Sequence, residues 1–126
     1  MAYREAQGFF EDIFEAAQTG KRKKLFKLFC GADLLVIDDL FLKKRLPQTA
    51  ADDLLDVILE RYRHRKSTMI TSNRPIEDWG KLLGDNAAAS AILDRLLHRG
   101  HLLKFEGKSY RLKEASKRLA LEKKKN

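Results

Sequence analysis

Two adjacent carboxylates, Asp38 and Asp39, follow an apolar run in this chain, and an amide, Asn73, follows a second run further along. Adjacent carboxylates in apolar surroundings are costly unless a cation compensates their charge. Carboxylate oxygens are also the ligands that Mg²⁺ prefers in proteins. The pattern therefore favours a cation site, although an Asp at the end of a strand is also a common turn or N-cap residue.

Two strands and the helix between them must position these residues. Residues 34–38 are apolar without alternation before they turn acidic, which is typical of a parallel strand covered on both faces. A long amphipathic helix over 50–63 and a β-branched strand over 67–71 follow. Such strand-helix-strand units are parallel, and parallel sheets bind ligands at the carboxyl ends of their strands. We therefore expect Asn73 beside the acidic pair; its alternative role is to shape the turn before Pro75.

Apolar spacing predicts the other elements of an α/β chain. Helices are expected at about 4–18, 21–30, 76–83 and 87–98, and a C-terminal hairpin at 101–105 and 109–112. Thr49–Asp52 resembles a capping box at the start of helix 50–63. The predicted domain is 1–112, followed by a basic tail over 113–126 that is expected to fray.

The charge balance favours a polyanionic partner such as nucleic acid. The 126 residues include 26 basic and 18 acidic side chains, a formal net charge of +8. The candidate phosphate contacts lie in two cationic runs, for which solvated charged surface is the alternative: Lys21, Arg22, Lys23 and Lys24, and Lys43, Lys44 and Arg45. The single cysteine, Cys30, excludes an internal disulfide and a cysteine cluster for zinc, which suits a cytoplasmic setting. No apolar run is long enough to span a membrane.

Other catalytic patterns fail on spacing. Gly107-Lys108-Ser109 copies the end of a phosphate-binding P-loop, but Leu102 stands where that motif needs its first Gly. The three histidines have no matching carboxylate or cysteine spacing for a metal site. No serine lies on a nucleophile elbow.

Six separated blocks in one order resemble the IstB-type helper ATPases of bacterial insertion sequences, relatives of DnaC-type helicase loaders in the AAA+ class. The blocks are Asp33–Asp39, Glu60–Tyr62, Ser67–Asn73, Asp78–Gly80, Ala91–His98 and Gly107–Leu112. The resemblance covers nearly the whole chain. It implies a partial three-layer P-loop-NTPase (AAA+) sheet with parallel strands flanked by helices, plus the C-terminal hairpin.

The resemblance also implies a role for each candidate residue. Asp38 would be the Walker B aspartate that holds Mg²⁺ through coordinated water. Asp39 would be the acidic residue that polarises the attacking water, which is usually a Glu in AAA+ proteins. Asn73 would be the sensor that orients this water against the γ-phosphate of ATP. Arg95 would be the arginine finger that reaches the nucleotide of a neighbouring subunit. Family members assemble as homo-oligomers on DNA and pass target DNA to a transposase.

One departure from the family is large, because its P-loop and first strand precede the segment that matches this chain. We expect the isolated chain not to hydrolyse ATP measurably, and a P-loop is to be sought in the codons upstream of Met1. A sheet without its first strand is also expected to self-associate. Two alternatives remain at this stage: a non-enzymatic nucleic-acid-binding domain that uses the two cationic runs and residues 61–66, and a helicase loader of the DnaC type.

Overall fold

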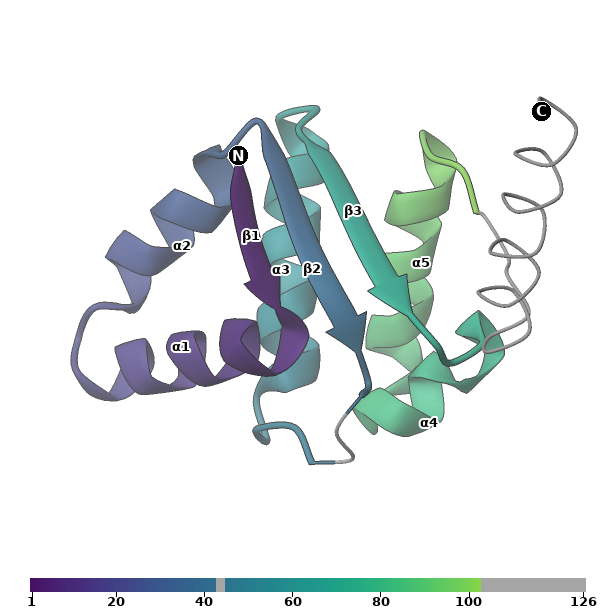
Figure 1. Ribbon diagram of the computed structural model, residues 1–126, viewed down its shortest axis with the longest axis horizontal. Helices are drawn as coiled ribbons and strands as arrows, with labels where there is room; N and C mark the ends of the chain where they lie inside the picture. Colours follow the sequence, from purple (N-terminus) through teal and green to yellow (C-terminus); the bar gives the residue numbers. More distant parts are fainter. Residues whose placement is uncertain (43–44, 103–126) are drawn as a thin grey trace, which may run out of the picture.

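The computed structural model describes residues 1–42 and 45–102, which form a three-stranded sheet with helices along it (Figure 1). The elements in chain order are β1 (Ala2–Glu5), α1 (Ala6–Gln18), α2 (Arg22–Gly31), β2 (Leu34–Leu40), α3 (Ala50–Arg63), β3 (Ser67–Ser72), a short 3-10 turn (Ile76–Asp78), α4 (Trp79–Leu83) and α5 (Asn86–His98).

The sheet has the order β1-β2-β3, and both neighbouring pairs are parallel. Val36 in the central strand faces Tyr3 on one side and Met69 on the other. Leu40 pairs with Ser72 where β2 and β3 end, which defines the carboxyl edge of the sheet. The strands start at the opposite, amino edge. The predicted α/β class with a parallel sheet flanked by helices is confirmed, and it is consistent with part of a P-loop NTPase fold.

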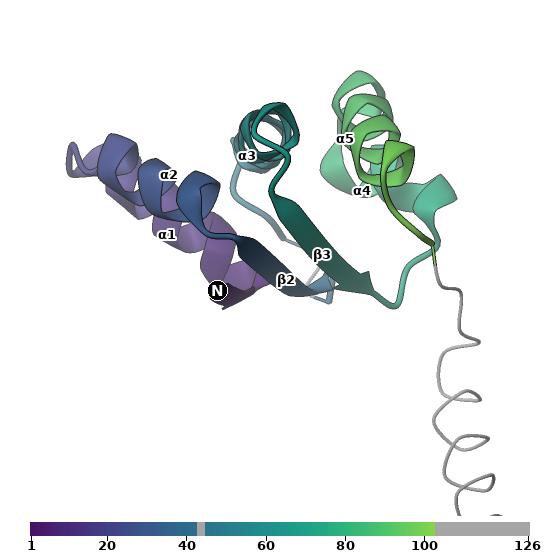
Figure 2. The ribbon, with the colours of Figure 1, turned by 90° about the horizontal axis from the view of Figure 1, so that it is seen from above.

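The helices lie along one face of the sheet, as the view from above shows (Figure 2). Leu35 and Ile37 of β2 are fully buried on this face. They belong to one apolar cluster with Phe9 of α1 and Leu54 of α3, among others. Burial of these large apolar side chains stabilises the fold by about 1.5–3 kcal/mol each.

The other face of the sheet is open within the described residues. Tyr3 is 50% exposed and Met69 is 54% exposed, while Val36 between them is half-buried. The expected coverage of β2 on both faces is therefore not found in the part of the chain that the structure describes. We call the row Tyr3, Val36 and Met69 the open face.

Some sequence-based boundaries were wrong. Residues 2–5 form a strand, so the predicted helix over 4–18 starts only at Ala6. The strand forms because its backbone pairs with β2, and this long-range partner leaves no clear local signal. Strands β2 and β3 also run further than predicted, to Leu40 and Ser72.

The expected capping box at α3 is also wrong. Thr49 has a backbone conformation (φ −90°, ψ 3°) that makes no side-chain cap. Its hydroxyl instead donates to Asp53 Oδ2, one turn into the helix, at 2.8 Å. His101 and Leu102 have no regular structure, and the rest of the predicted hairpin and the basic tail lie outside the described residues.

The buried side chain of Arg61 links several segments at the amino edge of the sheet through hydrogen bonds. Its side chain is fully buried and donates to the carbonyl oxygens of Phe29 (2.6 Å), Ala32 (2.7 Å) and Ser67 (2.5 Å), and to Thr68 Oγ1 (2.9 Å). Burial lowers the pKa of Arg61. The residue joins α2 to the starts of β2 and β3, so it is no contact for nucleic acid.

No helix in the described part of the chain is long and apolar enough to cross a membrane.

Candidate functional site

The carboxylate of Asp38 lies at the carboxyl edge, held by hydroxyl groups from both neighbouring strands. The Tyr3 phenol of β1 donates to Asp38 Oδ2 at 2.8 Å, and the Thr71 hydroxyl of β3 donates to Asp38 Oδ1. The bond to the carboxylate raises the pKa of Tyr3. These contacts follow from the sheet register, since side chains two residues apart on a strand share a face.

Asp39 turns away from the regular strand. Its φ is +58°, in the left-handed region, and the pairing of β2 with β3 is irregular between Ile37 and Leu40. The Asp39 amide donates to Thr71 Oγ1 at 2.9 Å. Thr71 therefore touches both acidic residues and fixes their relative position.

Asn73 follows β3 directly and reaches the same edge. The Ser72 hydroxyl donates to the Leu40 carbonyl at 2.7 Å, which ties the ends of β2 and β3 together. Asn73 is exposed, and its side chain makes no hydrogen bond to another described residue. The structure thus brings Asp38, Asp39 and Asn73 to one edge as predicted, with the amide open to solvent.

The donor set at this edge fits Mg²⁺ in its chemistry. It consists of hard oxygen ligands, and Mg²⁺ sites typically combine one or two carboxylates with water and substrate phosphates. Both oxygens of Asp38 already accept hydroxyl groups, so contact through coordinated water suits this carboxylate better than direct ligation. The described residues contain no group of three or more His, Cys, Asp or Glu side chains able to hold a metal alone.

Arg95 lies at the other end of the molecule from the acidic pair. It belongs to the second half of α5, which runs back to the amino edge (Figure 1). There it lines a pocket with Ser67 and Thr68, at the start of β3. It donates to Asp94 Oδ2 at 2.9 Å, and its guanidinium lies 5.7 Å from the centre of the Tyr62 ring. Within one chain, Arg95 and the acidic pair are separate sites.

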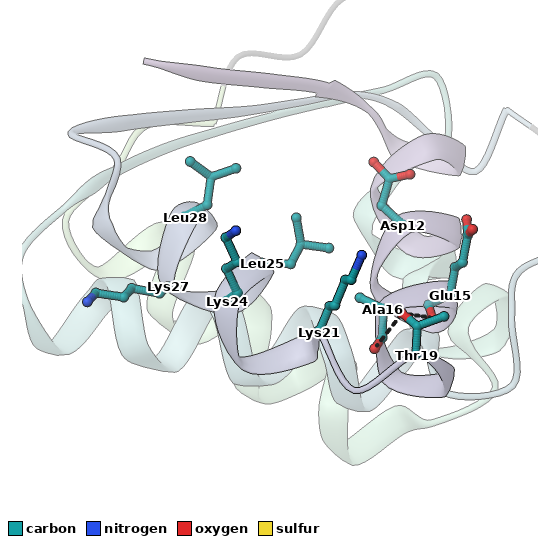
Figure 3. Close-up of a pocket in the computed structure, with 9 residues that line it drawn as sticks. All are labelled: Asp12, Glu15, Ala16, Thr19, Lys21, Lys24, Leu25, Lys27 and Leu28. Carbon is teal, nitrogen blue, oxygen red and sulfur yellow. Dashed lines mark hydrogen bonds between the residues drawn. The ribbon is translucent and has the colours of Figure 1, made fainter.

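The first cationic run lies where α1 turns into α2, beside a groove of about 730 Å³ (Figure 3). Lys21 and Lys24 line this α1–α2 groove together with Asp12 and Glu15 of α1, which form the opposite wall. Opposite charges on the two walls reduce the net attraction for phosphate. Lys23 is exposed.

Arg22 has an internal role. It pairs with Asp53 and Asp56 of α3, each at 3.2 Å, and its guanidinium stacks 4.4 Å from the Phe26 ring. In the second cationic run Arg45 is exposed, while Lys43 and Lys44 lie outside the described residues.

The sequence-based reasoning missed Tyr3 and Thr71. Thr71 had a signal in the alternation of its strand. Met69 pairs with Val36, and Thr71 and Asp38 each come two residues later, so both side chains lie on the same face of the sheet. Tyr3 has no signal of its own, because it precedes the predicted helix over 4–18 and lies in a strand of only four residues with mixed polarity. Its contact with Asp38 depends on parallel pairing across 35 residues.

The fold and this edge define a class: a parallel α/β sheet of the P-loop NTPase kind with an acidic pair near the carboxyl end of its central strand. Residues 1–118 match the family described as "IstB-like ATP binding protein", and the chain belongs to this family.

Among its relatives is the "Insertion sequence IS5376 putative ATP-binding protein" of Geobacillus stearothermophilus, 38% identical over 96% of this chain and 47% of the relative. The "Insertion sequence IS21 putative ATP-binding protein" of Pseudomonas aeruginosa is 35% identical over 83% of this chain and 39% of its own length. The chain thus spans less than half the length of these relatives.

Proposed function

We propose that this chain supplies the metal-binding and water-orienting edge of an ATP-dependent helper of DNA transposition. The observation that carries the proposal is the meeting of Asp38, Asp39 and Asn73 at the carboxyl edge of two adjacent parallel strands. Membership of the IstB-like family supports a nucleotide as the ligand.

Each residue at the edge has a distinct task in this proposal. Asp38, oriented by Tyr3 and Thr71, would hold Mg²⁺ through water. When bound, the metal neutralises charge on the β- and γ-phosphate oxygens of ATP. Asp39 accepts a proton from the attacking water, and Asn73, whose amide is open to solvent, orients that water.

The remaining partners also belong to the proposal. Arg95 lies too far round the molecule to serve the acidic pair of its own chain, which favours action on the nucleotide of a neighbouring copy in a homo-oligomer. Such an arginine supplies about 10³–10⁵ in rate in related enzymes. DNA contacts come from Lys21, Lys23, Lys24 and Arg45, and the assembled protein passes DNA to a transposase.

A chimera tests the catalytic part. The portion of the Geobacillus relative that precedes the matched segment is joined to this chain, and ATP turnover is measured with Mg²⁺. Asp38→Asn should abolish turnover, because the carboxylate charge that holds the metal is lost. Asp52→Asn, which changes an exposed acid in the first turn of α3, should leave turnover unchanged.

Two results would contradict the proposal. Retained turnover in the Asp38→Asn chimera would remove the metal assignment. A chimera that binds DNA with strong salt dependence but shows no effect of nucleotide would favour the plain nucleic-acid-binding domain instead.

A further inference from the structure

A second hollow lies at the amino edge, between the C-terminal ends of α3 and α5 and the start of β3. Its volume is about 330 Å³, at the small end for ligand sites. We call it the cationic pocket. The residues that line it are Ile58, Tyr62, Arg65, Lys66, Ser67, Thr68, Arg95, Leu96, Arg99 and Gly100.

Four of these residues are cations and none is a carboxylate. The α1–α2 groove is larger but carries two acids with its three lysines. The cationic pocket is therefore the more positive of the two hollows.

Two of the cations lie against the same aromatic ring, that of Tyr62. The guanidinium of Arg99 lies 4.3 Å from the centre of the Tyr62 ring, and that of Arg95 lies 5.7 Å from it. Arg99 also donates to the Tyr62 carbonyl at 3.2 Å. The Tyr62 hydroxyl lies 2.6 Å from His98 Nδ1, which fixes the ring. Like charges four residues apart on a helix repel each other, so an anion between them would stabilise the arrangement.

The local opposing charges are too small to neutralise the pocket. Two helix C-termini point here, each equivalent to roughly half a negative charge. Lys66 pairs with Asp33 at 3.1 Å, and Arg95 pairs with Asp94 at 2.9 Å. Both carboxylates are largely exposed, and ion pairs of this kind contribute about 0–1 kcal/mol, so a more highly charged anion can replace them.

We propose that the cationic pocket binds a chain of phosphate groups, with Arg99, Lys66 and Arg65 joining Arg95 as its ligands. Guanidinium groups bind phosphate through two parallel hydrogen bonds, which suits paired arginines. The triphosphate of a nucleotide and the backbone of a DNA strand offer the same chemistry. Phosphate binding here depends only on the residues that line the pocket, so the proposal does not require ATP hydrolysis at the carboxyl edge.

Titration of the whole chain with inorganic triphosphate tests the pocket. The double variant Arg99→Gln/Lys66→Gln should bind triphosphate at least about tenfold more weakly than the wild type, measured by calorimetry at fixed salt. The control Arg63→Gln/Lys81→Gln removes the same charge from residues that do not line the pocket, and should change affinity by less than about twofold. Circular dichroism checks that each variant is folded. If the double variant does not fold, Arg65→Gln, an exposed cation, replaces it with an expected loss of about threefold.

A fluorescent single-stranded oligothymidine distinguishes the two sources of phosphate. Displacement of the oligonucleotide by triphosphate, with weaker binding in the pocket variant, supports a DNA backbone as the ligand. Unchanged oligonucleotide binding with weakened triphosphate binding supports a nucleotide. The proposal is overturned if wild-type protein binds no triphosphate, or if the pocket and control variants weaken binding equally.

Discussion

At the scale of single residues, the backbone conformation of Asp39 favours a short acidic side chain at this position. The φ of +58° at this position lies in a region that Asp adopts more readily than longer side chains. The shorter acid therefore fits the irregular end of β2.

The phenol of Tyr3 gives a pH dependence to the same edge. Its pKa in the folded chain is raised above the unfolded value of about 10, because it donates to the Asp38 carboxylate. The stabilisation from this bond is thus complete below about pH 10 and is lost as the pH rises through the folded pKa. Tyr3→Phe should be less stable than wild type at neutral pH, and the difference should shrink at alkaline pH.

Urea unfolding of both proteins across this pH range provides the measurement. Tyr62→Phe, which changes a phenol at the other edge of the sheet, is the control for general alkaline effects. A wild-type advantage over Tyr3→Phe that stays constant through the alkaline range would show that the phenol does not stabilise the carboxylate.

At the scale of elements, Arg22 joins α2 to α3. Asp53 is buried, and among the described residues the Thr49 hydroxyl is its one remaining side-chain partner if Arg22 is removed. We expect Arg22→Ala to lower the free energy of unfolding by about 1–2 kcal/mol, less than for a fully buried pair because Arg22 is partly exposed. Lys23→Ala, next to it and exposed, should cost less than about 0.5 kcal/mol. Urea denaturation measures both, and equal losses would contradict the pairing as the cause.

The elements also differ in how well they could be predicted from the sequence. The helix over 50–63 and the strands at 34 and 67 were predictable, because each has a local apolar pattern with a clear start. Strand β1 was not, since four residues with mixed polarity become a strand only by pairing with β2. The candidate site followed the same rule: Asp38, Asp39 and Asn73 were found from strand ends, whereas Tyr3 required the missed strand.

At the scale of the whole molecule, the open face predicts self-association. Tyr3, Val36 and Met69 form an apolar row with no helix over it among the described residues. Met69→Glu should lower the association constant at least about tenfold, because it places a charge in any contact made through this row. Sedimentation velocity over a range of concentrations gives the constant.

A matched change separates this row from general effects of added charge. Leu28→Glu introduces the same acid at an exposed apolar residue of α2, which lines the α1–α2 groove. It should leave association through the open face intact. Equal losses from the two substitutions would place the contact elsewhere.

The partners of Arg61 have a consequence for how the molecule responds to its solvent. They are carbonyl oxygens and one hydroxyl, none of which gains a proton in acid or draws counter-ions from salt. Low pH should therefore loosen the carboxylate-dependent carboxyl edge first, while the contacts of Arg61 at the amino edge stay intact.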